Sequence, residues 1–291
     1  MAPFGHVLTA MVTPFTPDGA VDFERFTRLA RHLVASGSDG LVVAGTTGEA
    51  PTLSDEEKLA LFGAAVDAVG GRAVVVAGTG TYDTAHSVDL TRAAADLGVT
   101  AVMAVTPYYS RPDQRGLLAH FTAIADATDL PVLVYNIPSR TARLIEVSTL
   151  VELSRHPGIV AVKDAVDDVA FTTRTKVAVG GDLAIYSGSD IFTLPQLAVG
   201  AVGVVSVASH LVGPRIAAMV EAHHAGDHAA ALAIHDDLVG VFDLCFAEPN
   251  PQPVKAALGR LWEPVGRPRL PLVEAAPATV DALVSAVEAL Q

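Results

Sequence analysis

Lys163 is the residue whose type and position point most directly to chemistry, because it ends the apolar run 159–162. A free lysine has a pKa of about 10.4 and is almost fully charged at pH 7. Burial disfavours the charged form and lowers the pKa, which leaves an amine able to attack a carbonyl carbon. The alternative is a structural ion pair with Asp164 or Asp167. Lys163 alone leaves both interpretations open.

Hydroxyl groups stand at the ends of similar apolar runs, on Thr46, Thr47, Tyr109 and Tyr135. Forming a Schiff base requires protons to move to and from a carbinolamine, and hydroxyls relay protons without adding charge. Taken singly these residues are ordinary, since a Gly-Thr-Thr-Gly segment is usually a turn and paired tyrosines usually pack in a core or an interface. Their joint occurrence with Lys163 favours chemistry at one site.

Two groups of this set could bind carboxylates. The Thr47 hydroxyl and the backbone amides of residues 45–48 suit one carboxylate. Arg140 offers a rigid guanidinium for a second, although a lone arginine more often forms a surface ion pair. The ten histidines include no His-Glu-x-x-His motif, and we expect no metal site.

Eight short apolar runs alternate with helix-like stretches and define the elements that would position these residues. The runs are 7–12, 40–44, 73–78, 101–106, 132–136, 159–163, 183–187 and 203–207. They are nearly continuous in apolar residues, as in parallel strands buried on both faces. We therefore predict an α/β fold, a (β/α)₈ TIM barrel, whose active site lies at the carboxyl ends of the strands. An open doubly wound sheet is the alternative, but it usually has fewer strands and a glycine-rich dinucleotide turn.

The last part of the chain has no strand-like runs. Residues 228–246, 252–261 and 278–290 are predicted to form three helices, with Lys255 at the start of the second rather than forming another Schiff base. The predicted organisation is a catalytic barrel over residues 1–225 and a C-terminal three-helix appendage over residues 226–291.

Composition excludes several classes of partner. A formal net charge of −13 disfavours nucleic acid and anionic membrane surfaces. The mean hydropathy of +0.42 is high, but even the most apolar stretch, 194–212, is interrupted by polar residues. The first six residues do not resemble a signal peptide, and a single cysteine, Cys245, fits a reducing compartment. These features predict a cytoplasmic protein.

With these residues together, the chain resembles the dihydrodipicolinate synthase/N-acetylneuraminate lyase family of pyruvate-dependent class I aldolases. The likeness extends from about residue 8 to residue 272. The matching motifs are 45–49, 107–109, 135–140, 162–164, 203–207 and 248–255.

The resemblance implies that Lys163 forms an imine with pyruvate and that Tyr135 donates and accepts protons. Thr46 would link Tyr135 to Tyr109, which a neighbouring subunit supplies in this family. A homotetramer, built as a dimer of dimers, is therefore implied. The covalent pyruvate imine on Lys163 needs no metal or organic cofactor.

The resemblance also implies the substrate contacts. Thr47 and the backbone near Val205 would hold pyruvate. Gly188 is expected to be a substrate-binding residue as well. Arg140 would bind the carboxylate of the second substrate, L-aspartate 4-semialdehyde. The product belongs to lysine and diaminopimelate biosynthesis.

One departure from the family pattern concerns feedback by L-lysine. Lysine-inhibited members carry histidine, asparagine and glutamate around an interface pocket, where this sequence has Asp55, Lys58, Tyr82 and His86. Lys58 would repel a cationic effector, so we expect weak or absent inhibition.

Two other functions stay open from the sequence. A related aldolase could act on a sugar acid, such as N-acetylneuraminate or a 2-keto-3-deoxy-sugar acid, although Arg140 argues for a second carboxylate instead of a polyol chain. A non-catalytic regulator on the same fold is disfavoured by the presence of Lys163, Tyr135, Thr46 and Tyr109 together.

Overall fold

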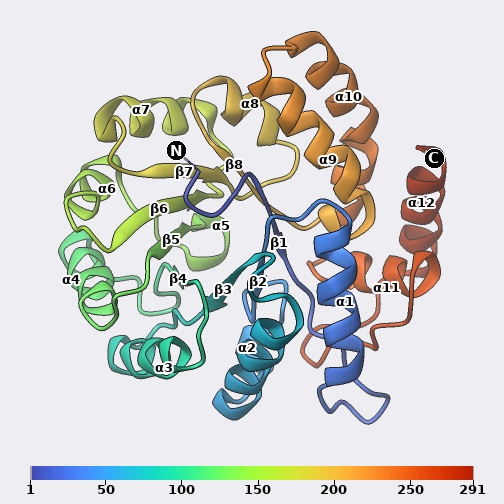
Figure 1. Cartoon of the computed structure of the whole chain (residues 1–291), viewed down its shortest axis with the longest axis horizontal. Coiled ribbons are helices and arrows are strands. Elements are labelled where there is room, and N and C mark those ends of the chain that lie inside the picture. The colour runs from blue at the N-terminus through green and yellow to red at the C-terminus, as the bar shows by residue number, and fades with distance from the viewer. Residues whose placement is uncertain (1, 291) are drawn as a thin grey trace.

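Eight parallel strands close into a barrel in chain order in the computed structural model, which describes residues 2–290 (Figure 1). The strands are β1 Val7–Ala10, β2 Gly40–Val43, β3 Val74–Gly78, β4 Ala101–Val105, β5 Val132–Asn136, β6 Ile159–Asp164, β7 Ala184–Ser187 and β8 Gly203–Ser206. The last strand pairs with the first, with Leu8 opposite Val205. The predicted TIM barrel is confirmed, and the open sheet is wrong because no edge is left between β1 and β8 within the described residues.

Helices surround the barrel and connect successive strands (Figure 1). They are α1 Phe23–Ala35, η1 Ala50–Thr52, α2 Asp55–Val69, α3 Thr84–Asp96, α4 Gln114–Ala125, α5 Pro138–Thr141, α6 Val147–Leu153, α7 Val169–Val179, α8 Thr193–Ala198 and α9 Ser209–His224. The capping box expected from the sequence is present, since the Ser54 side chain accepts from Glu57 N and the Glu57 side chain accepts from Ser54 N. Helix α9 begins before Pro214 and tolerates it through a non-helical conformation at Val212.

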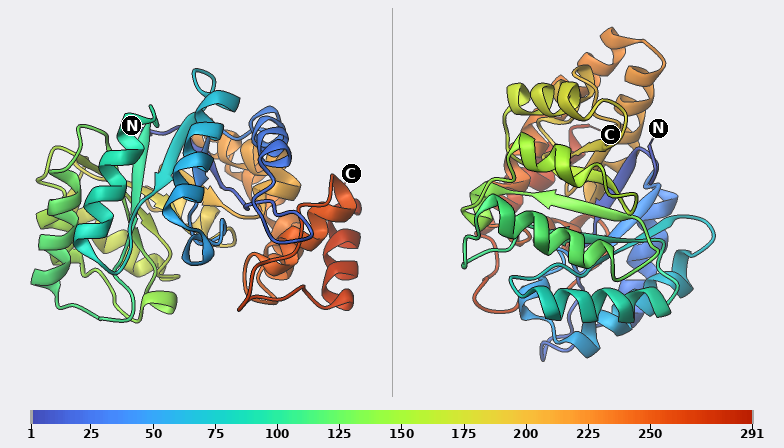
Figure 2. Two further views of the ribbon diagram at one scale, coloured as in Figure 1. Left: turned by 90° about the horizontal axis from the view of Figure 1, so that it is seen from below. Right: turned by 90° about the vertical axis from the view of Figure 1, so that its left-hand side faces the viewer.

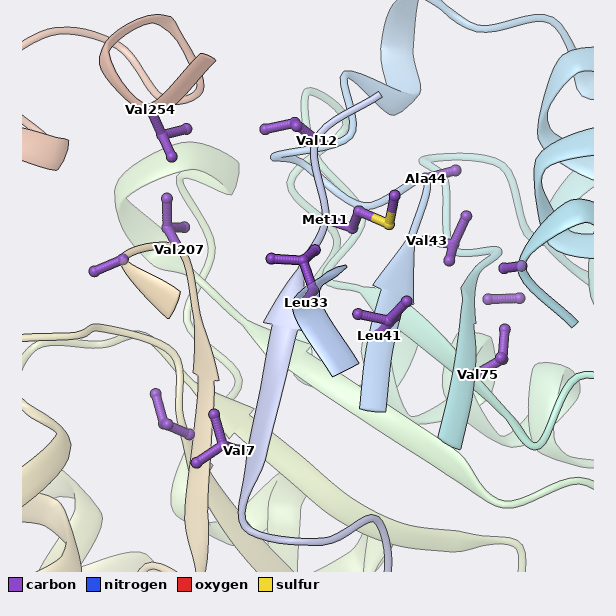
Figure 3. Close-up of a cluster of buried hydrophobic side chains, with 14 of the residues drawn as sticks. Val7, Met11, Val12, Leu33, Leu41, Val43, Ala44, Val75, Val207 and Val254 are labelled. Atoms are coloured by element: carbon purple, nitrogen blue, oxygen red, sulfur yellow. The ribbon is translucent and has the colours of Figure 1, made fainter. Parts of the chain in front are cut away.

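Alternate residues of each strand face two separate apolar layers. Leu8 and Val42 belong to the layer inside the barrel. Their neighbours Val7 and Leu41 belong to the layer that packs against the helices (Figure 3). This alternation follows from the period of two in a strand. It explains why the strand sequences are apolar almost without interruption.

Two aromatic side chains pack together in the interior layer beside the start of β1. Phe4 stacks on Tyr186, with ring centroids 5.9 Å apart. The Tyr186 hydroxyl accepts a hydrogen bond from Phe4 N at 3.1 Å and donates one to the Gly5 carbonyl at 2.9 Å. The polar tip of this buried ring is thereby satisfied.

The chain ends in α10 His228–Cys245, α11 Gln252–Leu261 and α12 Pro277–Glu288. These three helices lie close to the predicted positions and gather beside α9 and α1, at one side of the barrel (Figure 2). On this arrangement we propose that the barrel ends near residue 225 and that the remainder is an appendage to it. Within residues 2–290, no helix combines the length and the apolar character needed to cross a membrane.

Candidate active site

Lys163 projects into the interior of the barrel near the carboxyl end of β6. Ala161 and Ala165 on the same strand and its extension belong to the interior layer, so the alternation of side chains places Lys163 there too. Its side chain is buried, and Nζ lies 4.2 Å from the centroid of the Tyr135 ring on the neighbouring strand. The two residues are directly opposite each other in the register of β5 and β6.

The environment of Lys163 lowers its pKa to about 7. Desolvation by burial is the largest cause, the positive charge of Arg140 acts in the same direction, and the Asp190 carboxylate opposes both. At neutral pH the neutral amine is therefore far more populated than in a free lysine. A structural ion pair of Lys163 with Asp164 is absent from the described residues, because Asp164 instead accepts from Thr172 Oγ1 at 2.7 Å and from Val166 N at 3.1 Å.

Capture of a carbonyl compound by Lys163 is expected to depend on pH through this amine. Since only the neutral form attacks, the rate of imine formation at low 2-oxo acid concentration should rise about tenfold per pH unit below the pKa and level off above about pH 7. Rapid quenching with borohydride between pH 5 and 9, followed by mass spectrometry, measures this rate. A profile still rising steeply at pH 9 would show that the amine keeps an ordinary pKa.

Tyr135 is the second buried group of the site. Burial raises the pKa of its phenol to about 12, while the nearby charge of Arg140 and the polar side chain of Thr46 act against this rise. The phenol is therefore protonated at neutral pH and able both to donate and to accept a hydrogen bond. Its ring lies against Lys163, and its hydroxyl interacts with Thr46.

A cavity of about 380 Å³ opens beside these residues. Its lining includes Thr46, Tyr135 and Arg140, and it extends past Tyr82 and Tyr108. Lys163 does not line this space, but its Nζ contacts the Tyr135 ring, which does. The structure thus brings four of the predicted residues together, namely Lys163, Tyr135, Thr46 and Arg140.

Tyr109 is the predicted residue that stands apart. It is 94% exposed, adopts a left-handed backbone with φ of 68°, and does not line the cavity. Its neighbour Tyr108 does line it, and packs edge-on against Tyr82 at 5.3 Å between centroids. Within one chain, Tyr109 does not reach Lys163 or Tyr135.

The remaining predicted residues, Thr47, Val205 and Gly188, do not line the cavity. Thr47 is buried, and its hydroxyl accepts a hydrogen bond from Asn250 Nδ2 at 2.9 Å. Val205 lies on β8 in the interior layer. Gly188 packs so tightly on β6 that an added Cβ would come within 2.7 Å of the Ala165 Cβ, and its amide donates to the Asp164 carbonyl at 2.7 Å. A side chain at this position would push the ends of β6 and β7 apart.

Asp190 is a functional candidate that the sequence reasoning missed. Its buried carboxylate accepts from the Ser206 hydroxyl, from Val207 N at 3.0 Å and from Ala208 N at 3.1 Å. Burial raises the pKa of Asp190, and its charge counteracts the depression of the Lys163 pKa. The signal available in the sequence was a carboxylate three residues after the seventh apolar run.

A charged cluster borders the wide part of the cavity. The Asp55 carboxylate lies 3.2 Å from Lys58 Nζ and 2.7 Å from His86 Nε2, and both of these basic residues line the cavity. Neither this cluster nor any other group of three or more histidine, cysteine, aspartate or glutamate side chains in residues 2–290 is arranged to hold a metal ion.

The fold and these residues define a class of protein, the (β/α)₈-barrel enzymes with a buried lysine and a tyrosine at the carboxyl ends of the strands. The chain belongs to the Dihydrodipicolinate synthetase family, which it matches over residues 3–290.

Relatives support this assignment along the whole length. The chain is 52% identical over 290 residues to a 4-hydroxy-tetrahydrodipicolinate synthase of Synechococcus sp. (strain CC9605), covering 99% of this chain and 96% of the relative. A crystal structure of dihydrodipicolinate synthase from Bacillus anthracis superposes with a TM-score of 0.97 at 46% identity and covers 100% of both chains. A monomeric dihydrodipicolinate synthase variant has a TM-score of 0.95 at 34% identity, covering 98% of this chain and 96% of the variant.

Proposed function

We propose that this enzyme condenses pyruvate with L-aspartate 4-semialdehyde to give 4-hydroxy-tetrahydrodipicolinate, a step of lysine and diaminopimelate biosynthesis. The observation that carries the proposal is the buried, partly neutral amine of Lys163 beside the Tyr135 phenol, in a chain about half identical to synthases of that name.

The reaction starts when the Lys163 amine attacks the ketone carbon of pyruvate and water leaves, giving an imine. Loss of a proton from the pyruvate methyl group produces an enamine, whose carbon attacks the aldehyde of the second substrate. The amino group of that substrate then adds to the imine carbon and releases Lys163. The sequence forms one C–C and one C–N bond and needs no metal or organic cofactor.

Tyr135 is the proton donor and acceptor in this proposal. Its pKa of about 12 keeps the proton on the phenol in the resting state, so Tyr135 donates to the carbinolamine oxygen that leaves as water. The Thr46 hydroxyl, which acts on the Tyr135 phenol, provides a path for the proton that returns.

Substrate carboxylates are assigned to two places. We assign the Thr47 hydroxyl, the backbone at Val205 and the turn at Gly188 to pyruvate, at the carboxyl ends of the strands. Arg140, which lines the cavity, binds the carboxylate of the aldehyde. A sugar acid would present hydroxyl groups to this guanidinium instead, so Arg140 favours the semialdehyde.

We assign Tyr109 to the active site of a neighbouring subunit, within a homotetramer built as a dimer of dimers. A tyrosine that is 94% exposed on a left-handed backbone is unusual in a monomer, and a partner surface would cover it. Sedimentation velocity determines the assembly. We also propose a cytoplasmic location, which suits the buried free thiol of Cys245.

The function is tested by trapping and by substrate choice. Borohydride added with pyruvate should give a covalent adduct whose peptide map places it on Lys163. A coupled assay should detect turnover with pyruvate and L-aspartate 4-semialdehyde and none with N-acetylneuraminate. An unmodified chain would refute the imine, and cleavage of the sugar acid would reassign the substrate.

Weak or absent inhibition by L-lysine is expected from the charged cluster at the cavity. Lys58 already occupies one Asp55 oxygen and His86 the other, so a cationic effector meets a positive charge and no free carboxylate there. Initial rates measured over an L-lysine titration check this. Strong inhibition in the submillimolar range would contradict it.

A further inference from the structure

The C-terminal helix α11 reaches the carboxyl ends of the strands, where the proposed site lies. Figure 3 shows Val254 of α11 above the end of β8, near Val12 and Val207. The adjacent residue, Lys255, is buried although it carries a charge. Its surroundings show which part of the barrel it contacts.

Lys255 forms a buried ion pair with Glu49, the last residue of the Gly-Thr-Thr-Gly-Glu turn after β2. Nζ lies 2.7 Å from Glu49 Oε1, and both side chains are 1% exposed. The second carboxylate oxygen accepts from Arg269 N at 2.8 Å, and the ammonium group also donates to the Thr13 carbonyl at 2.9 Å. Both charges are therefore paired and hydrogen-bonded, as buried charges must be.

Three consecutive residues of the turn are held from outside it. The Thr47 hydroxyl accepts from Asn250, the Gly48 carbonyl accepts from Thr13 Oγ1 at 2.7 Å, and the Glu49 carboxylate binds Lys255. Asn250 and Lys255 both belong to the segment that leads into and begins α11. The appendage thus contacts the turn through two independent side chains.

The turn needs such support because its backbone is strained at both ends. Ala44 and Glu49 have φ of 51° and 59°, a left-handed conformation that non-glycine residues adopt only when the surrounding structure imposes it. Thr46 and Thr47, which interact with Tyr135 and with Asn250, lie between these two residues. Their hydroxyl positions therefore depend on how firmly the two ends are held.

We propose that the Glu49–Lys255 pair and Asn250 are positioning residues, through which the appendage fixes the Thr46–Thr47 turn for pyruvate binding. A buried ion pair contributes little net stability over apolar groups of the same size, so we assign this pair the role of fixing one geometry. The inference rests on the proposed function, because it assigns Thr47 to pyruvate. None of the three residues touches the reacting atoms.

The test uses the full-length double variant Glu49→Gln/Lys255→Met, which removes both charges together and avoids leaving one unpaired. The matched control is Arg260→Met/Asp281→Asn, which removes an exposed ion pair with a 2.7 Å contact between α11 and α12. Half-saturation by pyruvate is measured from borohydride trapping, together with KM for each substrate and the thermal midpoint.

For the double variant we expect at least about a tenfold rise in the pyruvate half-saturation concentration, with the aldehyde KM little changed. The control should match the wild type. A folded double variant with wild-type pyruvate saturation would overturn the proposal, as would equal increases in both KM values. If the wild-type chain itself gives no adduct, the proposed function has failed, which is a separate result.

Asn250→Ala provides a second test that removes no charge. Loss of its bond to Thr47 should raise the pyruvate half-saturation concentration several-fold at nearly unchanged kcat. If the double variant does not fold, Asn250→Ala becomes the deciding test of the proposal. Unchanged pyruvate saturation in Asn250→Ala would refute the positioning role.

Discussion

Lys163→Met is expected to abolish condensation, with a loss of at least about 10⁴-fold in kcat/KM, while the barrel stays folded. Methionine fills nearly the same volume but has no amine, so the imine cannot form. A well-oriented intramolecular group has an effective molarity of about 10⁵–10⁸ M, which a free amine in solution cannot replace. The coupled assay measures this loss, and borohydride with pyruvate should leave the variant unmodified.

Lys176→Met is the matched control for this change. Lys176 lies on α7, where its ammonium group donates to the Gly180 carbonyl at 2.7 Å, away from the cavity. This variant should keep wild-type rates and wild-type trapping. Because removal of a buried amine relieves desolvation, Lys163→Met should unfold at the same temperature as the wild type or higher. Substantial turnover by Lys163→Met would end the Schiff-base assignment.

Tyr135→Phe is expected to lower kcat by about 10²–10⁴-fold, the range for a positioned general acid and base. The ring that covers Lys163 is kept, but the phenol that donates to the leaving hydroxyl is lost. Trapping with pyruvate should still reach completion, more slowly than in the wild type. Rapid-quench trapping and steady-state rates together separate slow imine formation from loss of the lysine.

Tyr186→Phe is the control that shows whether the loss of any buried phenol lowers kcat. Its hydroxyl bonds to Phe4 and Gly5, and the residue does not line the cavity, so its loss should lower stability by about 1 kcal/mol without changing kcat more than a few-fold. A Tyr135→Phe enzyme as active as Tyr186→Phe would remove Tyr135 from the mechanism.

The strands could be predicted from the sequence because a parallel barrel buries both faces of each strand. Runs such as 132–135 are therefore almost entirely apolar, and each ends where the chemistry begins. Lys163 stood out for the same reason, as a charge at the end of a buried run. Local sequence patterns were sufficient where all the residues on which a prediction depended belonged to one strand.

Contacts between distant segments could not be read in this way. Glu49 and Lys255 are separated by 206 positions, and Thr47 and Asn250 by 203. Each of these residues is of a type that is usually found on an exposed surface. Lys255 was correctly expected at the start of a helix, but periodicity does not show which side chain it meets. Asp190 was missed for the same reason, since its role depends on amides of the next strand–helix connection.

The burial of Lys163 has a consequence for the order of events in the proposed reaction. The residue is 5% exposed and does not line the cavity, whereas Arg140 does. A ketoacid bound to the amine would therefore lie deeper than an aldehyde held at Arg140, and the water expelled on imine formation would have to leave past the aldehyde position. We expect the ketoacid to bind and dehydrate before its aldehyde partner arrives.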